Sequence, residues 1–234
     1  FITGGSRGLG FETAAALSRQ GIKTVIFAKD SERLANASKN LSSPSYQIDL
    51  ERLENIVPVF NQAISEHGVP DLLILAHGVM SDKMSKTLKT NLDHWRSVMA
   101  INLDSVFTIV NHVGAMMAES RSGRIIIFSA CLGRMSGPGN AGGLAPYRIS
   151  KAGVNALVRN LAHETGHGTR GLFVDAICPN HSRTDMGGAD APRSAAEGAA
   201  CAVWLATREL MPGETPTGLL WEDQEVIQIG RAHV

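Results

Sequence analysis

The 234-residue sequence predicts a single α/β domain, in which a doubly wound parallel sheet carries helices on both faces. Short apolar runs alternate with helical patterns along the whole chain, as in repeated β-α-β units. These runs are continuously apolar rather than alternating, which is typical of strands buried on both sides. The chain shows no internal repeat and no linker long enough to divide it, and its length suits one α/β domain.

The strands and helices can be assigned in order. After a short first strand, buried strands are expected at 24–28, 46–48, 72–76, 125–129, 172–178 and 218–221. The helical patterns between them cover 9–19, 31–40, 53–67, 93–119, 146–163 and 193–207. Two polar, glycine-rich segments, 133–143 and 180–195, are expected to be loops. Both follow strands, and open α/β sheets bind ligands beyond the carboxyl ends of their strands.

Both ends of the chain look unnatural. The sequence starts inside an apolar strand and without Met, so we expect a truncated first strand, and the sequence leaves room for a targeting segment upstream. The last residues, 229–234 (I-G-R-A-H-V), resemble the translation of a sequencing-library adapter. We therefore expect the domain to cover 1–228 and the remainder to be a non-native tail.

Composition excludes several classes of protein. Lys and Arg together number 22, as do Asp and Glu, whereas a binder of nucleic acid or anionic membrane needs a basic excess. No apolar run approaches the ~18 residues of a membrane helix. Three widely spaced cysteines suggest a reducing compartment and give neither a disulfide framework nor a metal site. We expect a cytoplasmic protein without nucleic-acid, membrane or metal partners.

The first turn reads T-G-G-S-R-G-L-G at residues 3–10, between the first strand and the first helix. Gly4, Gly8 and Gly10 allow a tight turn and close backbone approach, so that a pyrophosphate can sit at the helix N-terminus. The spacing alone is weak, because it also suits a purely structural turn. The order of strand, glycines and helix nevertheless predicts a dinucleotide site of the Rossmann type.

Charges near the second strand bear on the cofactor. Ala28 ends this strand, where an acidic residue would bind the ribose of NAD. Lys29 follows it and Arg7 lies in the glycine loop, and two cations can hold a 2′-phosphate, so we favour NADP(H) over NAD(H). Asp30 is a competing ribose ligand if the register slips, and Lys29 can equally be a solvated surface charge. Asp49, after the third strand, suits either the adenine amino group or a helix N-cap.

Tyr147 and Lys151 open a later helix and lie four residues apart, on one face. A phenol with a pKa of about 10 is a poor acid–base group at neutral pH, but a neighbouring ammonium stabilises the phenolate. The pair therefore indicates an acid–base site. A surface Tyr and Lys on an amphipathic helix are the alternative interpretation.

Together, the 3–10 loop, Asp49, Asn102 and the Tyr147-x3-Lys151 pair resemble the short-chain dehydrogenase/reductases over essentially the whole chain. Residues 184–199 and Pro216-Thr217-Gly218 are similar to the carbonyl-reductase-like branch. The resemblance implies hydride transfer between NAD(P)(H) and a small-molecule carbonyl or alcohol. Tyr147 would be the acid/base, Lys151 would bind the nicotinamide ribose and lower the tyrosine pKa, and Asn102 would hold a relay water.

The resemblance also implies further contacts. Related enzymes pair the 93–119 and Tyr147 helices across an interface, so we expect a homodimer or homotetramer. The cofactor-binding residues that motifs and resemblance together indicate are Thr3, Gly4, Ser6, Arg7, Gly8, Leu9, Gly10, Lys29, Asp49, Leu50, Ala76, Gly78, Tyr147, Lys151, Pro179 and Thr184.

The sequence departs from the family pattern at three places. Ala76-His77-Gly78 replaces Asn-Ala-Gly, and Asn180 replaces the glycine after Pro179. Ala130 stands where the catalytic serine is usual, and losing such a hydrogen-bond donor costs about 10²–10³ in rate.

Ser129 is the substitute that we name as catalytic, and Ser136 is another candidate. His77 is more readily a hydrogen-bonded core residue than a catalytic one, and His181 is a candidate for contact with the substrate. Because Ala130 lacks the donor, a cofactor-binding pseudoenzyme or interaction module is the alternative function.

Overall fold

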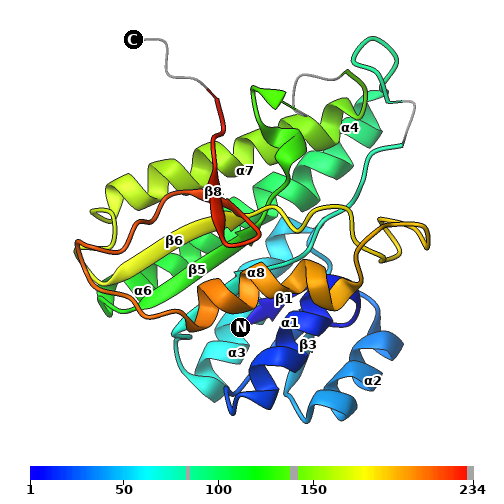
Figure 1. Cartoon of the computed structure of the whole chain (residues 1–234). Coiled ribbons are helices and arrows are strands. Elements are labelled where there is room, and N and C mark those ends of the chain that lie inside the picture. Colours follow the sequence, from blue (N-terminus) through cyan, green and yellow to red (C-terminus); the bar gives the residue numbers. More distant parts are fainter. Residues whose placement is uncertain (83–84, 138–141, 231–234) are drawn as a thin grey trace.

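The computed structural model describes residues 1–82, 85–137 and 142–230 (Figure 1). It forms one sheet in the order β3-β2-β1-β4-β5-β6-β7-β8. The strands are β1 (Ile2–Thr3), β2 (Ile26–Ala28), β3 (Ser45–Gln47), β4 (Leu72–Leu75), β5 (Gly123–Phe128), β6 (Leu172–Ile177), β7 (Leu220–Glu222) and β8 (Glu225–Ile227). All neighbours among these pair in parallel except β7 and β8. The predicted doubly wound class is confirmed, with β8 as an unpredicted antiparallel addition.

Helices cover both faces of the sheet. One face carries α1 (Gly8–Arg19), α2 (Ser31–Leu41) and α8 (Ala195–Thr207), and the other carries α3 (Ile56–His67), α5 (Ser105–Ile109) and α7 (Ala145–Glu164). Short 3-10 turns occur at η1 (Leu53–Asn55) and η4 (Cys131–Gly133). Alternation along the strands explains the two layers, because side chains of successive residues point to opposite faces. In β5, Ile125 and Ile127 join one apolar cluster while Ile126 and Phe128 join the other.

The predicted 93–119 helix is one helical stretch with two π-helical turns. Its segments are α4 (Leu92–Met99), η2 (Ala100–Asp104), α5, η3 (Val110–Gly114) and α6 (Ala115–Glu119). By length and composition, Leu92–Glu119 passes the test for a membrane span, contrary to the expectation from apolar runs, with a mean hydropathy of 1.2. However, 44% of that window is buried inside the fold, and the core helix of a soluble protein can have the same length and composition.

The end of the described chain packs on the loop after β5. The Met135 amide donates to the Ile229 carbonyl at 2.7 Å, and Arg134 Nε donates to the Gln228 carbonyl at 2.7 Å. Residues 231–234 lie outside the described residues, so the origin of the 229–234 tail stays a prediction.

Candidate active site

The glycine-rich loop joins β1 to α1 and leaves room for a ligand. Gly4 and Gly8 have φ values of 67° and 53°, a region where other residues are strained, and a Cβ on Gly10 would collide with the Gly4 carbonyl. At the start of α1, the N-cap side chain of Arg7 makes no capping hydrogen bond. The first N–H groups and the positive end of the helix dipole therefore favour an anion at this point.

This loop opens into a cleft of about 910 Å³ along the carboxyl ends of the strands. Most of the predicted cofactor residues line it: Gly4, Ser6, Arg7, Gly8, Leu9, Gly10, Lys29, Asp49, Leu50, Ala76, Gly78 and Thr184. Thr3, Tyr147, Lys151 and Pro179 are not among the lining residues. We call this the glycine-loop cleft.

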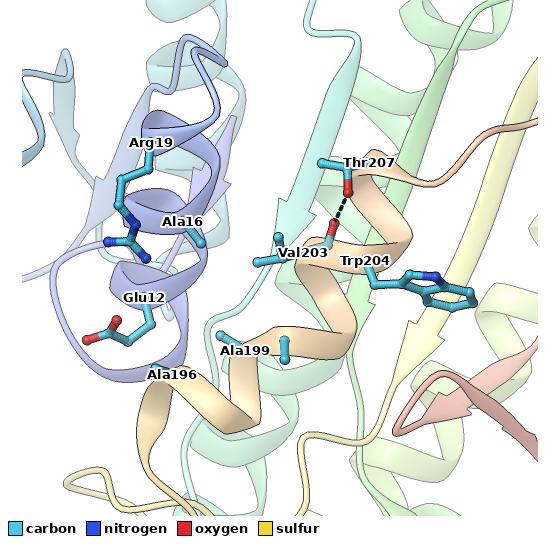
Figure 2. A pocket seen from close by; sticks show the side chains of 9 residues that line it. Glu12, Ala16, Arg19, Ala196, Ala199, Val203, Trp204 and Thr207 are labelled. Atoms are coloured by element: carbon cyan, nitrogen blue, oxygen red, sulfur yellow. Dashed lines mark hydrogen bonds between the residues drawn. The ribbon is translucent and has the colours of Figure 1, made fainter.

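A second hollow lies between α1 and α8, where alanines form much of the lining (Figure 2). Its polar lining comes from Glu12, Arg19 and Thr207, and the Thr207 hydroxyl is bonded to the Val203 carbonyl of its own helix. None of the predicted site residues lines it. The glycine-loop cleft is therefore the candidate site.

Charges at the β2 end of this cleft are paired. Lys29 Nζ lies 2.8 Å from the Asp49 carboxylate, while the Lys29 side chain stays mostly exposed, so Lys29 is a paired surface charge. Burial alone would raise the pKa of Asp49, but hydrogen bonds from Lys29 and the Glu51 amide outweigh it and hold the pKa below its usual value. Asp30 caps α2, since its carboxylate accepts from the Arg33 amide at 2.9 Å. Asp49 instead accepts from the Glu51 amide, at 3.2 Å.

An ionic bridge that the sequence did not predict crosses the cleft. Asp185, in the 180–195 loop, pairs with Arg7 of the glycine loop and lies 3.0 Å from Arg33 Nη1 of α2. The hydrogen bond from Arg33 and the charge of Arg7 hold the pKa of Asp185 below its usual value. A Cβ on Gly8 would lie 3.2 Å from the methyl group of Thr184, so the 180–195 loop lies directly over the glycine loop.

Tyr147 and Lys151 come together on α7 as predicted. Lys151 Nζ lies 6.0 Å from the centroid of the Tyr147 ring and donates to the Phe128 carbonyl at 2.7 Å. Both side chains are buried, and burial lowers the pKa of Lys151 to about 8. The expectation that Lys151 lowers the pKa of Tyr147 is wrong for this structure. Burial raises the pKa of Tyr147 above 10, with further increases from Cys178 and Cys131.

Asn102 occupies the π-helical turn η2 and holds the chain beyond β4. Its side chain accepts from the Val79 amide at 2.8 Å and donates to the Val79 carbonyl at 2.9 Å and to Ser150 Oγ at 3.1 Å. A Cβ on Gly78 would lie 3.3 Å from Asn102 Oδ1 and 3.5 Å from Lys151 Nζ. Asn102, Lys151 and Gly78 thus surround one point at the end of the glycine-loop cleft.

The side chain of Ser129 faces α7. Its hydroxyl donates to Asn155 Oδ1 at 2.6 Å and lies 3.3 Å from the Lys151 carbonyl, and among the described residues no hydrogen bond links it to Tyr147. Its catalytic role stays a prediction. Ala130, which follows it, is 6% exposed and offers only a methyl group.

His77 is a structural link. Its Nε2 lies 2.8 Å from Ser105 Oγ, whose proton goes to the Ile101 carbonyl, so Nε2 donates. Nδ1 then accepts from Thr3 Oγ1 at 2.6 Å. Burial lowers the pKa of His77 to about 3, with a smaller decrease from Lys151. The ring is therefore neutral at physiological pH and joins β1 to α5.

Comparison with known proteins establishes the family. The family model described as "short chain dehydrogenase" matches residues 1–194. The chain belongs to the short-chain dehydrogenase family. This short-chain dehydrogenase is 32% identical to a mitochondrial borneol dehydrogenase of Lavandula x intermedia over 186 residues, which cover 79% of this chain and 69% of the relative.

Two other proteins are similar to this short-chain dehydrogenase. It is 29% identical over 191 residues to a 3-oxoacyl-[acyl-carrier-protein] reductase of Synechocystis sp., with 79% of this chain and 74% of the relative covered. The solved structure of a short chain dehydrogenase from Escherichia coli CFT073 complexed with NADPH superposes with a TM-score of 0.83. It covers 94% of this chain and 93% of that one at 20% identity, which shows the fold alone.

Proposed function

We propose that this short-chain dehydrogenase is an NADP(H)-dependent oxidoreductase that interconverts a small-molecule carbonyl and its alcohol, as a carbonyl reductase does. The observation that carries the proposal is the meeting of Lys151, Asn102 and Gly78 where the glycine-loop cleft ends, with Tyr147 one helical turn from Lys151. Bound nicotinamide would supply or accept the hydride.

The chain's own residues have separate tasks in this proposal. The glycine loop and the N-terminus of α1 bind the pyrophosphate. Lys151 uses one donor on the Phe128 carbonyl and keeps two for the ribose hydroxyls. Tyr147 gives a proton from its Oη to the substrate oxygen, or removes one in the reverse direction. Asn102 fixes the Val79 backbone that lines the cleft.

Two guanidiniums support the preference for NADP(H). Arg7 and Arg33 already share one anion, the Asp185 carboxylate, at the mouth of the glycine-loop cleft. A 2′-phosphate would use the same charge-assisted hydrogen bonds. The solved Escherichia coli structure of similar fold is complexed with NADPH, which agrees with a preference for NADP(H).

The second candidate is a cofactor-binding protein without reductase activity. Ala130 supplies no hydrogen bond to a substrate oxygen, and burial raises the pKa of Tyr147. NADPH and NADH consumption should be measured over quinones, diketones, aldehydes and cyclic ketones, with the Tyr147→Phe variant as the matched control.

Turnover that the Tyr147→Phe variant lacks supports the enzyme. NADPH binding by fluorescence without turnover supports the second candidate. A protein that is folded by circular dichroism but binds no NADPH overturns both.

We further propose a cytoplasmic homodimer or homotetramer. What supports it is the family's pairing of the 93–119 and Tyr147 helices across an interface, together with the exposure of Phe107 on α5 and Ile149 on α7, at 54% and 44%. Light scattering at micromolar concentration tests this, and a monomeric mass contradicts it.

A further inference from the structure

Two cysteines lie side by side, each just beyond the end of one of two neighbouring strands. Cys178 directly follows β6, and Cys131 begins η4 three residues beyond β5. The two strands are parallel and in register, with Phe128 opposite Ile177 at their ends. Residues 47 positions apart in the chain are thereby brought together at the carboxyl edge of the sheet.

The two cysteines are in direct contact. The Cys131 amide donates to Cys178 Sγ at 3.1 Å, and the Cys178 thiol lies 3.9 Å from Glu222 Oε1. The adjacent Cys178 side chain is the main cause that lowers the pKa of Cys131 to about 7, and the charge of Arg134 adds to it. The lowered pKa favours the thiolate of Cys131, the form that reacts with electrophilic sulfur.

The two cysteines differ in access. Cys131 is half-buried and reachable from solvent, whereas Cys178 is 3% exposed and lies behind it. A solvent-accessible thiolate beside a buried thiol is the arrangement of an attacking and a resolving cysteine. Cys201, buried on α8 in the opposite face of the sheet, provides an internal comparison.

We propose that Cys131 and Cys178 form a redox-active dithiol beside Tyr147, which a small-molecule disulfide such as oxidised glutathione converts to a disulfide. The Cys131 thiolate attacks one sulfur of the small disulfide, forms a mixed disulfide and releases one thiolate. Cys178 then loses its proton and attacks the Cys131 sulfur, which releases the second thiol. Counted from two thiols, the protein loses two electrons and two protons, one of them when Cys131 ionises, and these reduce the small disulfide to two thiols.

The position of the pair gives its oxidation a consequence at the site. Both sulfurs influence the pKa of Tyr147, which places them within electrostatic reach of the phenol. η4 is also packed tightly on α7, because a Cβ on Gly133 would lie only 2.7 Å from the Ala152 amide nitrogen. A covalent tie between η4 and the residue before Pro179 therefore constrains the segment beside Tyr147 and Lys151.

The experiment treats the folded full chain with oxidised glutathione at neutral pH, blocks free thiols, and maps peptides by mass spectrometry without reduction. The wild type should give a Cys131–Cys178 cross-link with the loss of two hydrogens. Cys178→Ser should trap glutathione on Cys131, and Cys131→Ser should give neither product. Cys201→Ser, the matched control, should behave as the wild type.

Three results would overturn the dithiol. One is free thiols at both positions after treatment of the native wild type. Another is stable glutathione on wild-type Cys131 without a cross-link. The third is a cross-link that forms only in denaturant, which the circular dichroism of the treated protein would reveal. None of these depends on whether the protein is a reductase.

Discussion

Acidification should destabilise this protein through His77. The ring is 9% exposed and spans Thr3 and Ser105, so its neutral form is satisfied and its charged form is desolvated. Its pKa falls from the ordinary value of 6.5 to about 3 in the fold, chiefly because of burial. The unfolded chain therefore binds a proton at this residue over a pH range in which the folded chain does not.

The sign and size follow from this difference. Because the folded-state pKa is the lower one, the contribution of His77 is fully present above pH 6.5 and is lost as the pH falls toward 3. Each pH unit in this window changes the free energy of unfolding by about 1.4 kcal/mol. Between pH 6.5 and about pH 5, the loss is on the order of 2 kcal/mol.

Urea unfolding followed by tryptophan fluorescence measures this effect at fixed protein concentration. Wild type and His77→Asn should be compared across the window, because carboxylates titrate in both and cancel in the difference. The stability advantage of the wild type over the variant should shrink by about 2 kcal/mol on going to about pH 5. His112→Asn, which removes a half-buried imidazole bonded to Asn61, is the comparison variant. A constant difference between wild type and His77→Asn would refute the buried neutral imidazole.

Three further outcomes are expected. Ala130→Ser should raise kcat by about 10²–10³ in the NADPH assay by supplying the missing donor, and an unchanged rate would mean that the substrate oxygen lies elsewhere. Asp185→Asn should tighten NADPH binding by about two- to fivefold in a fluorescence titration, because it frees Arg7 and Arg33, whereas an equal gain for NADH would contradict a 2′-phosphate site. Phe107→Glu should lower the mass found by light scattering to that of a monomer, and an unchanged oligomer would exclude this face as the interface.

The fold was largely predictable because the sheet is buried on both faces. A strand such as β5 needs apolar side chains for both layers, so it appears as a continuous apolar run in the sequence. β8 was missed because Glu225 and Val226 are exposed and carry no such pattern. The π-helical turn at Asn102 was missed for another reason. It accompanies hydrogen bonds to Val79, which is distant in the sequence, and no local pattern encodes those.

The site was predictable where its chemistry is local. The glycine loop and the Tyr147–Lys151 spacing each lie within one turn or helix, and the structure places them as the pattern indicated. The Arg33–Asp185 bridge joins residues 152 positions apart, so nothing near either residue indicated it. The pKa of Tyr147 was predicted in the wrong direction, because the spacing of Tyr147 and Lys151 identifies the neighbour but not the burial, and burial is the main cause that raises this pKa.

His77 shows how a departure from the family pattern can be compensated. Thr3 ends the strand before the glycine loop, and Ser105 follows the turn that holds Asn102, so the imidazole ties the phosphate end of the cleft to the Asn102 turn. Protonation need not break these bonds, because Nδ1–H can donate to Thr3 Oγ1 while that hydroxyl turns to the Ile74 carbonyl, 3.5 Å away. Acid then destabilises the fold because the charged ring is desolvated, not because a hydrogen bond is lost. This agrees with burial as the main cause of the lowered pKa of His77.

A shorter side chain at this position has a different effect. His77→Asn cannot span both hydroxyls, so it should weaken NADPH binding as well as stability, even above pH 6.5 where the imidazole is neutral. Unchanged NADPH affinity in a destabilised His77→Asn protein would show that the imidazole supports the sheet alone, and that Gly4 keeps its position without it.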